Sequence, residues 1–431
     1  MGQEPLKCLA SLLAILAPLA IAGVAPAHAG SVTLQALMED VPESQIIEAM
    51  LPDFEKATGI HVRFQRVIYP EMHDRLVAQL SGKSSFYGLL EVDFLWAGEF
   101  TEAGWLVDLK PYVDKTGFDL KTMMPSMLDL VGYHKGVLYM IPMYNYSMGV
   151  IYRRDLLENP ALQAEYRAKI GRALVFPDTL ADYVEVSKFM NADAGVAGAA
   201  MQGQSGDPNS LEVSNYLFSA GGAYLAAKGK VALDSPEGER ALEFYVDNMA
   251  HAAQKGAFSA TLDDTFYLMC QGKAWSMVTY WWMLAQVDDR TKCPKVAGKV
   301  ALHVMPGGHG ESGGWGWAIP RNQSPELQEA AWRFIDWVQS VKISTARAMQ
   351  GHAPVDSTVF ADSAVLAKYP YYREAQGVVS SGKAFPVFAY SAQYEVLLGR
   401  QLSLAASGEL TPAAALKGAA GDLEVLLQKS H

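Results

Sequence analysis

Large aromatic side chains and a few polar ones gather where segments with strand character end. Five of the nine tryptophans lie at such places: Trp96, Trp281, Trp282, Trp315 and Trp317. The polar residues near these places are Glu99, Asn145, Gln204 and Asp207. Aromatic faces pack against the C–H faces of sugar rings, and carboxylates and amides hydrogen-bond to hydroxyls. The group therefore favours a cleft for a neutral polyhydroxylated ligand, whereas any single tryptophan is equally well explained as core material.

The stretch "PMYNYSMGVIYRRDLLEN", residues 142–159, places large side chains at every second position. On a β-strand alternate residues share one face, so Tyr144, Tyr146, Met148 and Val150 line one side. One interpretation is a half-buried strand. The other is a binding wall whose first aromatics face a ligand and whose last residues enter a core.

Motifs for catalysis lack the context that they require. Gly308, Gly310 and Gly313 spell GxGxxG, and residues 310–314 spell GxSxG, but both motifs need a helix directly afterwards. Residues 315–319 alternate as a strand instead, and the nine histidines show no metal-site spacing. The sequence therefore predicts no enzyme, no cofactor and no catalytic metal. The adjacent Tyr371 and Tyr372 leave open an alternative, because paired phenolates hold ferric iron in some exported binding proteins.

The elements that must position these residues alternate between strand and helix. The patterns predict strands over 31–37, 60–67 and 91–97, with helices over 44–59 and 70–82 between them. Further helices begin at Ser235-Pro236 and at Ser324-Pro325. Such alternation indicates an α/β fold with a largely parallel sheet. In open sheets of this kind ligands bind beyond the carboxyl ends of the strands.

The first 29 residues have the features of a signal peptide that is cleaved after Ala29. Lys7 precedes an apolar run, and Ala27-His28-Ala29 supplies the small residues of a cleavage site. The remainder is long enough for two large lobes. Its formal charge of −11 argues against a nucleic-acid partner. Cys270 and Cys293 remain after cleavage, and in an oxidising compartment they either form one disulfide or stay free.

Several segments resemble, in the same order, family 1 extracellular solute-binding proteins. They are "LPDFEKATGIHVRF", "DFLWAGEFTEAGWLVDLKPY", "GVLYMIPMYNYSMGVIYRRDLLEN", "QGKAWSMVTYWWM", "AAWRFIDWV" and the C-terminal "LAASGELTPAAALKGAAGDLE". The chain departs from the family pattern at Arg153, where Asn or Asp is usual, and at Tyr144, where a smaller residue is common. These departures concern the identity of the ligand rather than the fold.

The resemblance implies a two-lobe periplasmic binding protein fold (type II) with the ligand cleft between lobes joined by three crossings. The crossings are expected near 145–148, 277–280 and 338–344. The expected first lobe comprises residues 30–145 plus 281–340, and the second comprises 146–280 plus 341–431. The opening stretch would then be a crossing, so that its first half faces the cleft and "GVIY" enters the second sheet.

The resemblance also implies roles for particular residues. Trp96 and Glu99 match cleft positions of the first lobe, and Tyr146 matches a side chain that reaches the sugar at the first crossing. Trp282 matches a stacking aromatic, and Tyr394 lies close to another. Local pattern adds five more candidates: Tyr144, Asp207, Trp281, Trp315 and Trp317.

The function implied is that of the periplasmic substrate-binding component of an ABC importer. We expect a monomer that binds a sugar, a sugar alcohol or a short oligosaccharide, catalyses nothing, and delivers its ligand to the transmembrane subunits of a permease. The alternative is a protein of the same fold that binds ferric iron or another non-sugar solute.

Overall fold

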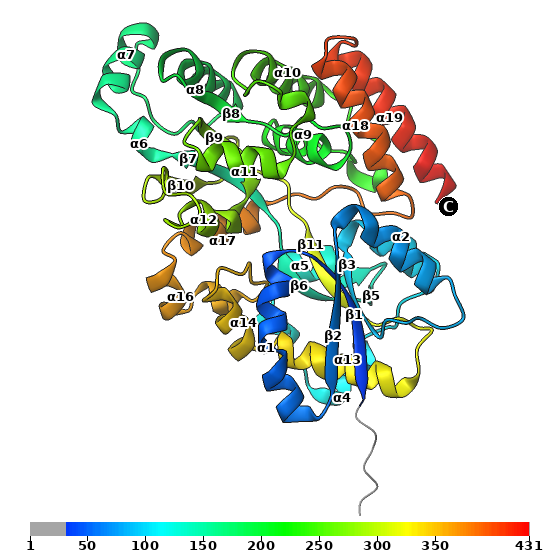
Figure 1. Cartoon of the computed structure of the whole chain (residues 1–431). Coiled ribbons are helices and arrows are strands. Elements are labelled where there is room, and N and C mark those ends of the chain that lie inside the picture. The colour runs from blue at the N-terminus through cyan, green and yellow to red at the C-terminus, as the bar shows by residue number, and fades with distance from the viewer. Residues whose placement is uncertain (1–31, 431) are drawn as a thin grey trace, which may run out of the picture.

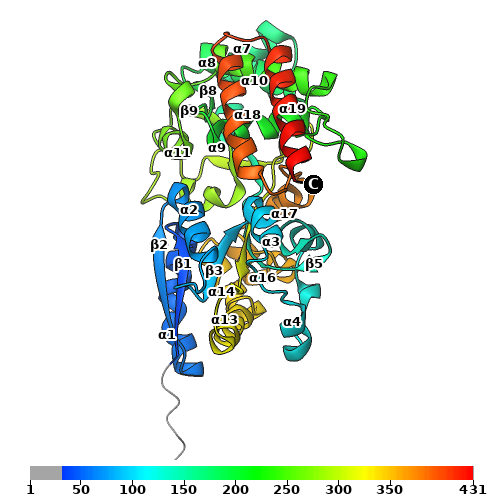
Figure 2. The ribbon, with the colours of Figure 1, turned by 90° about the vertical axis from the view of Figure 1, so that its right-hand side faces the viewer.

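A computed structural model describes residues 32–430, which form two α/β lobes, one above the other in Figure 1. The expected signal peptide lies outside these residues. No helix within 32–430 is long and apolar enough to cross a membrane. Figure 2 shows the same arrangement from the side.

The first lobe is built on a five-stranded sheet with strand order β2-β1-β3-β11-β6. Its strands are β1 (Thr33–Glu39), β2 (His61–Val67), β3 (Leu89–Asp93), β6 (Ile141–Asn145) and β11 (Gly314–Ala318). β1 runs parallel to β2 and β3, and β11 runs antiparallel to β3 and β6. Its helices are α1 (Pro42–Thr58), α2 (Tyr69–Leu80), α3 (Ala97–Glu102), α4 (Lys110–Thr116), α13 (Pro325–Val338) and α14 (Val341–Ala348). The strands predicted over 31–37 and 60–67 and the helices predicted over 44–59 and 70–82 are confirmed, whereas the strand predicted over 91–97 ends at Asp93 and continues as helix.

Helix α1 illustrates how the local sequence determines these elements. Pro42 occupies the first turn, where no backbone N–H is needed. Ile47, Leu51 and Phe54 fall on one helical face and are buried. Gly59 ends the helix at φ 73°, a left-handed conformation that glycine adopts without strain.

The second lobe has a four-stranded sheet with strand order β10-β7-β9-β8. Its strands are β7 (Met148–Arg153), β8 (Ala197–Ala200), β9 (Ala274–Tyr280) and β10 (Val300–His303). Its helices are α6 (Arg154–Leu157), α7 (Pro160–Ile170), α8 (Leu180–Asp193), α9 (Asp207–Ser219), α10 (Pro236–His251), α11 (Leu262–Cys270), α12 (Leu284–Val287), α17 (Tyr372–Ser381), α18 (Ser391–Ala406) and α19 (Pro412–Lys429). In Figure 2, α18 and α19 lie together against this lobe.

The chain passes between the lobes at places that only partly match the expectation. The first passage follows β6, where Tyr146 and Ser147 link it to β7 of the other sheet. The second passage was expected at 277–280, which is wrong, because the chain stays in the second lobe until β10 has paired with β7. It returns between residues 303 and 314. The expected assignment of residues 281–303 to the first lobe is therefore also wrong.

The third passage was expected near 338–344, but α14 begins there and still packs against α13 of the first lobe. The short helices α15 (Ser357–Phe360) and α16 (Ser363–Lys368) follow, and α17 then contacts β7 and β10. The chain therefore crosses to the second lobe between α14 and α17.

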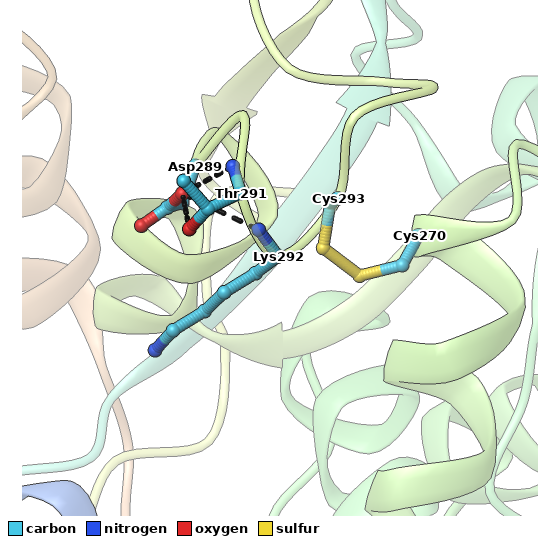
Figure 3. The surroundings of a disulfide bond; sticks show 5 residues. All are labelled: Cys270, Asp289, Thr291, Lys292 and Cys293. Carbon is cyan, nitrogen blue, oxygen red and sulfur yellow. Dashed lines mark hydrogen bonds between the residues drawn. A yellow bond between two sulfur atoms is a disulfide. The ribbon is translucent and has the colours of Figure 1, made fainter.

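Cys270 and Cys293 form a disulfide within the second lobe (Figure 3). The bond joins the end of α11 to the loop after α12, and it encloses β9 in a covalent loop. Of the two alternatives for these cysteines, the structure has the disulfide and not the free thiols. Asp289, on the same loop, accepts hydrogen bonds from Thr291 and the backbone N–H of Lys292.

Candidate ligand-binding cleft

A cavity of about 210 Å³ lies between the two sheets. The first lobe supplies part of its lining: Glu39, Val41, Tyr69, Asp93, Leu95, Tyr144 and Trp315. Tyr146 lies at the first passage, and the second lobe supplies the rest: Asp207, Leu211, Leu262, Tyr280 and Trp282. Residues of both lobes therefore line the same cavity.

The ends of strands place most of this lining. Glu39, Asp93 and Tyr280 are the last residues of β1, β3 and β9. β11 is antiparallel to β3, so Trp315, near the start of β11, pairs with Asp93 at the same edge. Asp207 is the first residue of α9. The cavity thus occupies the position at which open α/β sheets bind ligands.

Asp93 is held by hydrogen bonds from three directions. Its Oδ1 accepts from the hydroxyl of Tyr146 at 2.9 Å and from the backbone N–H of Leu95 at 3.2 Å. Its Oδ2 accepts from the hydroxyl of Tyr69 at 3.1 Å. The carboxylate therefore has a fixed orientation in the cavity wall before any ligand arrives.

Aromatic rings form two groups on opposite sides of the cavity. In the first lobe Tyr69 and Trp315 meet edge to face with centroids 5.8 Å apart. In the second lobe Tyr280 and Trp282 are stacked at 5.7 Å, and Tyr146 contacts Tyr280 at 5.5 Å. A ligand between these groups meets flat apolar faces from both lobes.

The acidic groups of the lining titrate well above their ordinary range. Burial raises the pKa of Glu39 to about 8, and the charges of Asp93 and Asp207 add to the effect. Burial likewise raises the pKa of Asp93 to about 7, although its hydrogen bonds oppose the shift. Burial also raises the pKa of Asp207. Negative charge is therefore costly in the empty cavity.

The effect of Glu39 on stability should consequently depend on pH. Because its pKa is higher in the folded chain, the folded state holds an extra proton between pH 4.5 and about 8. The stability due to that proton is lost as pH rises through about 8. We expect ligand-free Glu39→Gln to melt roughly 2–4 °C higher than the wild type at pH 9. At pH 4.5 the gap should be smaller, and a gap independent of pH, measured by calorimetry, would contradict the pKa shift.

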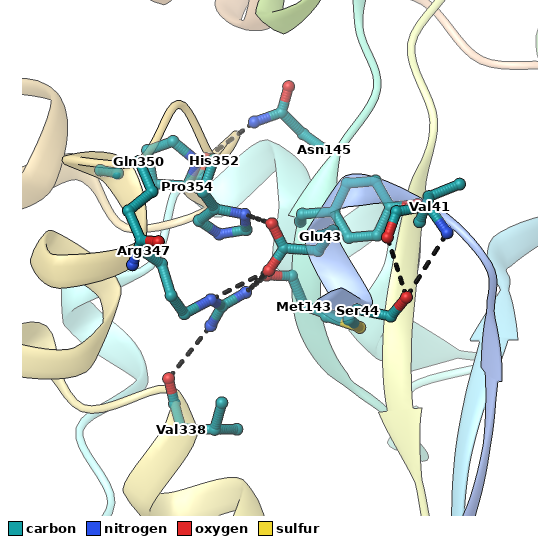
Figure 4. Close-up of polar contacts among 12 residues, drawn as sticks. Val41, Glu43, Ser44, Met143, Asn145, Val338, Arg347, Gln350, His352 and Pro354 are labelled. Carbon is teal, nitrogen blue, oxygen red and sulfur yellow. Dashed lines mark hydrogen bonds and ion pairs between the residues drawn. The ribbon is translucent and has the colours of Figure 1, made fainter. Parts of the chain in front are cut away.

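A second hollow of about 160 Å³ adjoins the cavity and shares Val41, Tyr144 and Trp282 with it. Buried Glu43 and His352 also line it. Glu43 accepts two hydrogen bonds from Arg347 and one from His352 (Figure 4). Burial lowers the pKa of His352 to about 4, so its neutral ring donates through Nδ1. This network ties α1 to the segment around α14 beside the cavity wall.

Five of the ten residues predicted for the site line the cavity. They are Tyr144, Tyr146, Asp207, Trp282 and Trp315. The stretch 142–159 combines the two interpretations, a binding wall and a buried strand. Tyr144 and Tyr146 line the cavity, whereas Met148 and Val150 are buried in β7.

Three predicted residues lie in the protein interior instead. Trp317 is fully buried against Phe334 of α13. Trp281 is fully buried, donates to Asn145 and packs against Tyr372. Tyr394 is fully buried in α18. Trp317 lies two residues farther along β11 than Trp315, beyond the cavity, and Trp281 and Tyr394 face the interior from the 3₁₀ helix after β9 and from α18.

Trp96 and Glu99 lie behind the cavity wall. The chain turns into a short 3₁₀ helix after Asp93, and Trp96 therefore stacks against Tyr69, at 5.5 Å, outside the lining. Glu99 pairs with His73 at 2.8 Å. Trp96 supports Tyr69, while Glu99 has no contact with the cavity.

Sequence reasoning missed Glu39, Asp93, Tyr69 and Tyr280. Three of them are the last residues of strands, so they lie at the same edge of the sheets that the sequence indicates through Trp96. The sequence pattern places the end of the third strand a few residues too far along the chain, because periodicity locates strand ends only approximately. Tyr69 opens α2 and carries no comparable signal.

Two α/β lobes with a cavity between them, lined from both sides, define a two-lobe ligand-binding protein. Residues 39–343 match the model of the family described as bacterial extracellular solute-binding protein, and the chain belongs to this family.

Relatives agree with this assignment. The chain is 23% identical over 273 residues to the mannitol-binding protein of Pseudomonas aeruginosa, a match that spans 62% of this chain and 60% of that protein. It is 26% identical to a solute-binding protein of Agrobacterium radiobacter K84 in complex with ribitol, with a TM-score of 0.80 over 92% of this chain and 98% of that one. Maltose-bound MalE3 of T. maritima is also 26% identical, with a TM-score of 0.81 over 92% of this chain and 100% of that one.

Proposed function

We propose that this chain is the periplasmic substrate-binding component of an ABC importer and that it carries a sugar or sugar alcohol. The observation that carries the proposal is the cavity itself. Aromatic rings and carboxyl groups from both lobes line one cavity. Relatives of the same fold hold ribitol and maltose, which supports this ligand class.

The size of the cavity favours a small ligand. Its volume of about 210 Å³ lies below the range of roughly 300–1,000 Å³ that is usual for drug-sized ligands. A single monosaccharide or alditol suits this space better than an oligosaccharide does. The adjoining hollow leaves room for a substituent at one end.

Ligand binding drives the transport step in this proposal through closure of the lobes. A ligand that contacts Asp93 of the first lobe and Trp282 of the second favours the closed state, because only that state brings both sets of contacts together. The closed monomer then presents a joint surface of both lobes to the permease. The chain itself catalyses no reaction.

The proposal predicts a thermal shift with a cognate sugar or alditol. A ligand that binds only the folded chain at 100 times its Kd adds about 2.7 kcal/mol to the free energy of unfolding. We expect at least one member of a panel of pentoses, hexoses and alditols to raise the melting temperature and to be recovered unchanged after denaturation. A panel without any shift would contradict the ligand class.

The alternative of ferric iron is not favoured by the positions of the two tyrosines. The hydroxyl of Tyr372 donates to the backbone carbonyl of His352, and neither Tyr371 nor Tyr372 lines either hollow. Within residues 32–430 no cluster of three His, Cys, Asp or Glu residues is placed to hold a metal ion. A coloured ferric complex that is lost in Tyr372→Phe would revive the alternative.

A further inference from the structure

The ionisable side chains that line the cavity include carboxyl groups but no basic group. Its thirteen lining residues include the carboxylates of Glu39, Asp93 and Asp207. Within residues 32–430 no lysine, arginine, histidine, asparagine or glutamine lines this cavity. A neutral sugar hydroxyl both donates and accepts hydrogen bonds, so a site built for such hydroxyls alone would offer donors and acceptors together.

The tyrosine hydroxyls do little to correct this imbalance. Those of Tyr69 and Tyr146 already donate to Asp93, and that of Tyr144 donates to Glu39 at 3.4 Å. Two donors remain among the described residues: the hydroxyl of Tyr280, which also lines the cavity, and Nε1 of Trp282, which has no partner. The cavity therefore presents mainly carboxyl groups and aromatic faces.

More acidic groups lie close behind the lining. Glu311 is fully buried, and neither of its carboxylate oxygens has a hydrogen-bond partner within the described part of the chain. Burial raises its pKa, and so do the charges of Asp93 and Asp207. Burial and Asp207 likewise raise the pKa of the buried Glu395. Of the cations nearby, Arg347 is already engaged by Glu43, and Lys292 lines the adjoining hollow rather than this cavity.

Carboxylates from both lobes therefore face one space without a basic side chain in its wall. Glu39 and Asp93 belong to the first lobe and Asp207 to the second, so closure of the empty protein brings them together and their charged forms repel one another. A ligand with a positive charge would remove that repulsion. It would also interact favourably with the faces of surrounding Tyr and Trp rings.

We propose that the ligand carries a protonated amine as well as hydroxyls, that is, an amino alditol or an amino sugar. Its ammonium group lies among Glu39, Asp93 and Asp207, and its carbon chain lies between the aromatic groups of the two lobes. This inference rests on the proposed function and narrows its ligand class.

The test is calorimetric titration at pH 7.5 with two matched pairs of probes. The pairs are D-sorbitol with 1-amino-1-deoxy-D-sorbitol, and D-glucose with D-glucosamine. Within each pair one hydroxyl is replaced by an amine. We expect the amine in at least one pair to bind about ten to a hundred times more tightly. Binding should also release protons to the buffer, because a cation lowers the pKa of the surrounding carboxyls.

Variants locate the charge. In Glu39→Gln/Asp207→Asn the preference for the amine should fall to about twofold or less, while in Glu71→Gln it should persist. Glu71 pairs with Arg75 on the exposed surface of α2 and thus controls for the loss of an acid elsewhere in the first lobe. A preference that survives in the double variant would overturn the placement of the ammonium group.

The outcomes separate the two proposals. A sorbitol or glucose that binds as tightly as its amine overturns this inference and leaves sugar transport intact. If neither pair binds, mass spectrometry of the ligand released from periplasmically expressed protein decides: a basic amine supports the inference and a neutral sugar overturns it. If no sugar, alditol or amine derivative is released from the protein and none binds to it in titration, both the proposed function and this inference are overturned.

Discussion

Replacing Arg347 with methionine should lower the free energy of unfolding by about 3–5 kcal/mol. Arg347 is fully buried, and its Nε and Nη2 donate to Glu43 at 3.0 and 2.6 Å. The same guanidinium donates to the backbone carbonyls of Val338 and Met143. Removing it leaves the buried Glu43 carboxylate with His352 as its remaining partner and without a cation, and it leaves several acceptors unpaired, which is the costly case.

Urea denaturation measures this loss directly. Arg347→Lys should recover only part of it, because an ammonium group lacks the planar fork that reaches Glu43 and two carbonyls together. Arg75→Met, which breaks an exposed pair with Glu71, is the matched control and should cost about 1 kcal/mol or less. A loss below about 1 kcal/mol in Arg347→Met would show that the network does not stabilise the fold.

Replacing Trp282 with alanine should weaken ligand binding by about a hundredfold to a thousandfold. The indole lines both hollows and stacks on Tyr280 with an interplanar angle of 12°. Buried aromatic side chains in the centre of an interface commonly account for 2–4 kcal/mol of affinity. Trp282 is only partly buried, so the variant should fold normally.

Titration calorimetry on the cognate ligand checks this result, with circular dichroism as evidence of folding. Trp282→Phe should retain part of the affinity because a ring remains. Trp105→Ala is the control: this indole is also partly buried but packs against Phe100 outside the cavity. Unchanged affinity in Trp282→Ala would remove the central residue from the site.

The fold was readable from the sequence because its signals are local. Apolar periodicity and the Pro and Gly residues at helix ends predicted β1, α1, β2 and α2 close to their observed bounds. The lobe boundaries were not readable in this way. The assignment of β10 to the second sheet depends on its pairing with β7, and that pairing joins residues about 150 positions apart.

The site was only partly readable, since it depends on where side chains point. Trp315 and Trp317 are two positions apart on β11, yet Trp315 lines the cavity and Trp317 packs against α13. Both side chains leave the same face of the strand, so their depth along β11 decides which of them meets the cleft. That depth follows from the register of β11 against β3, which no local pattern encodes.

The disulfide between Cys270 and Cys293 constrains a segment of the chain that contributes to the cavity. The loop that it closes contains both Tyr280 and Trp282, the aromatic pair that the second lobe contributes to the cavity. The cross-link restricts the conformations that this segment can adopt. Reducing the bond is therefore expected to loosen the side of the cavity that the second lobe supplies, and with it the hold on a ligand.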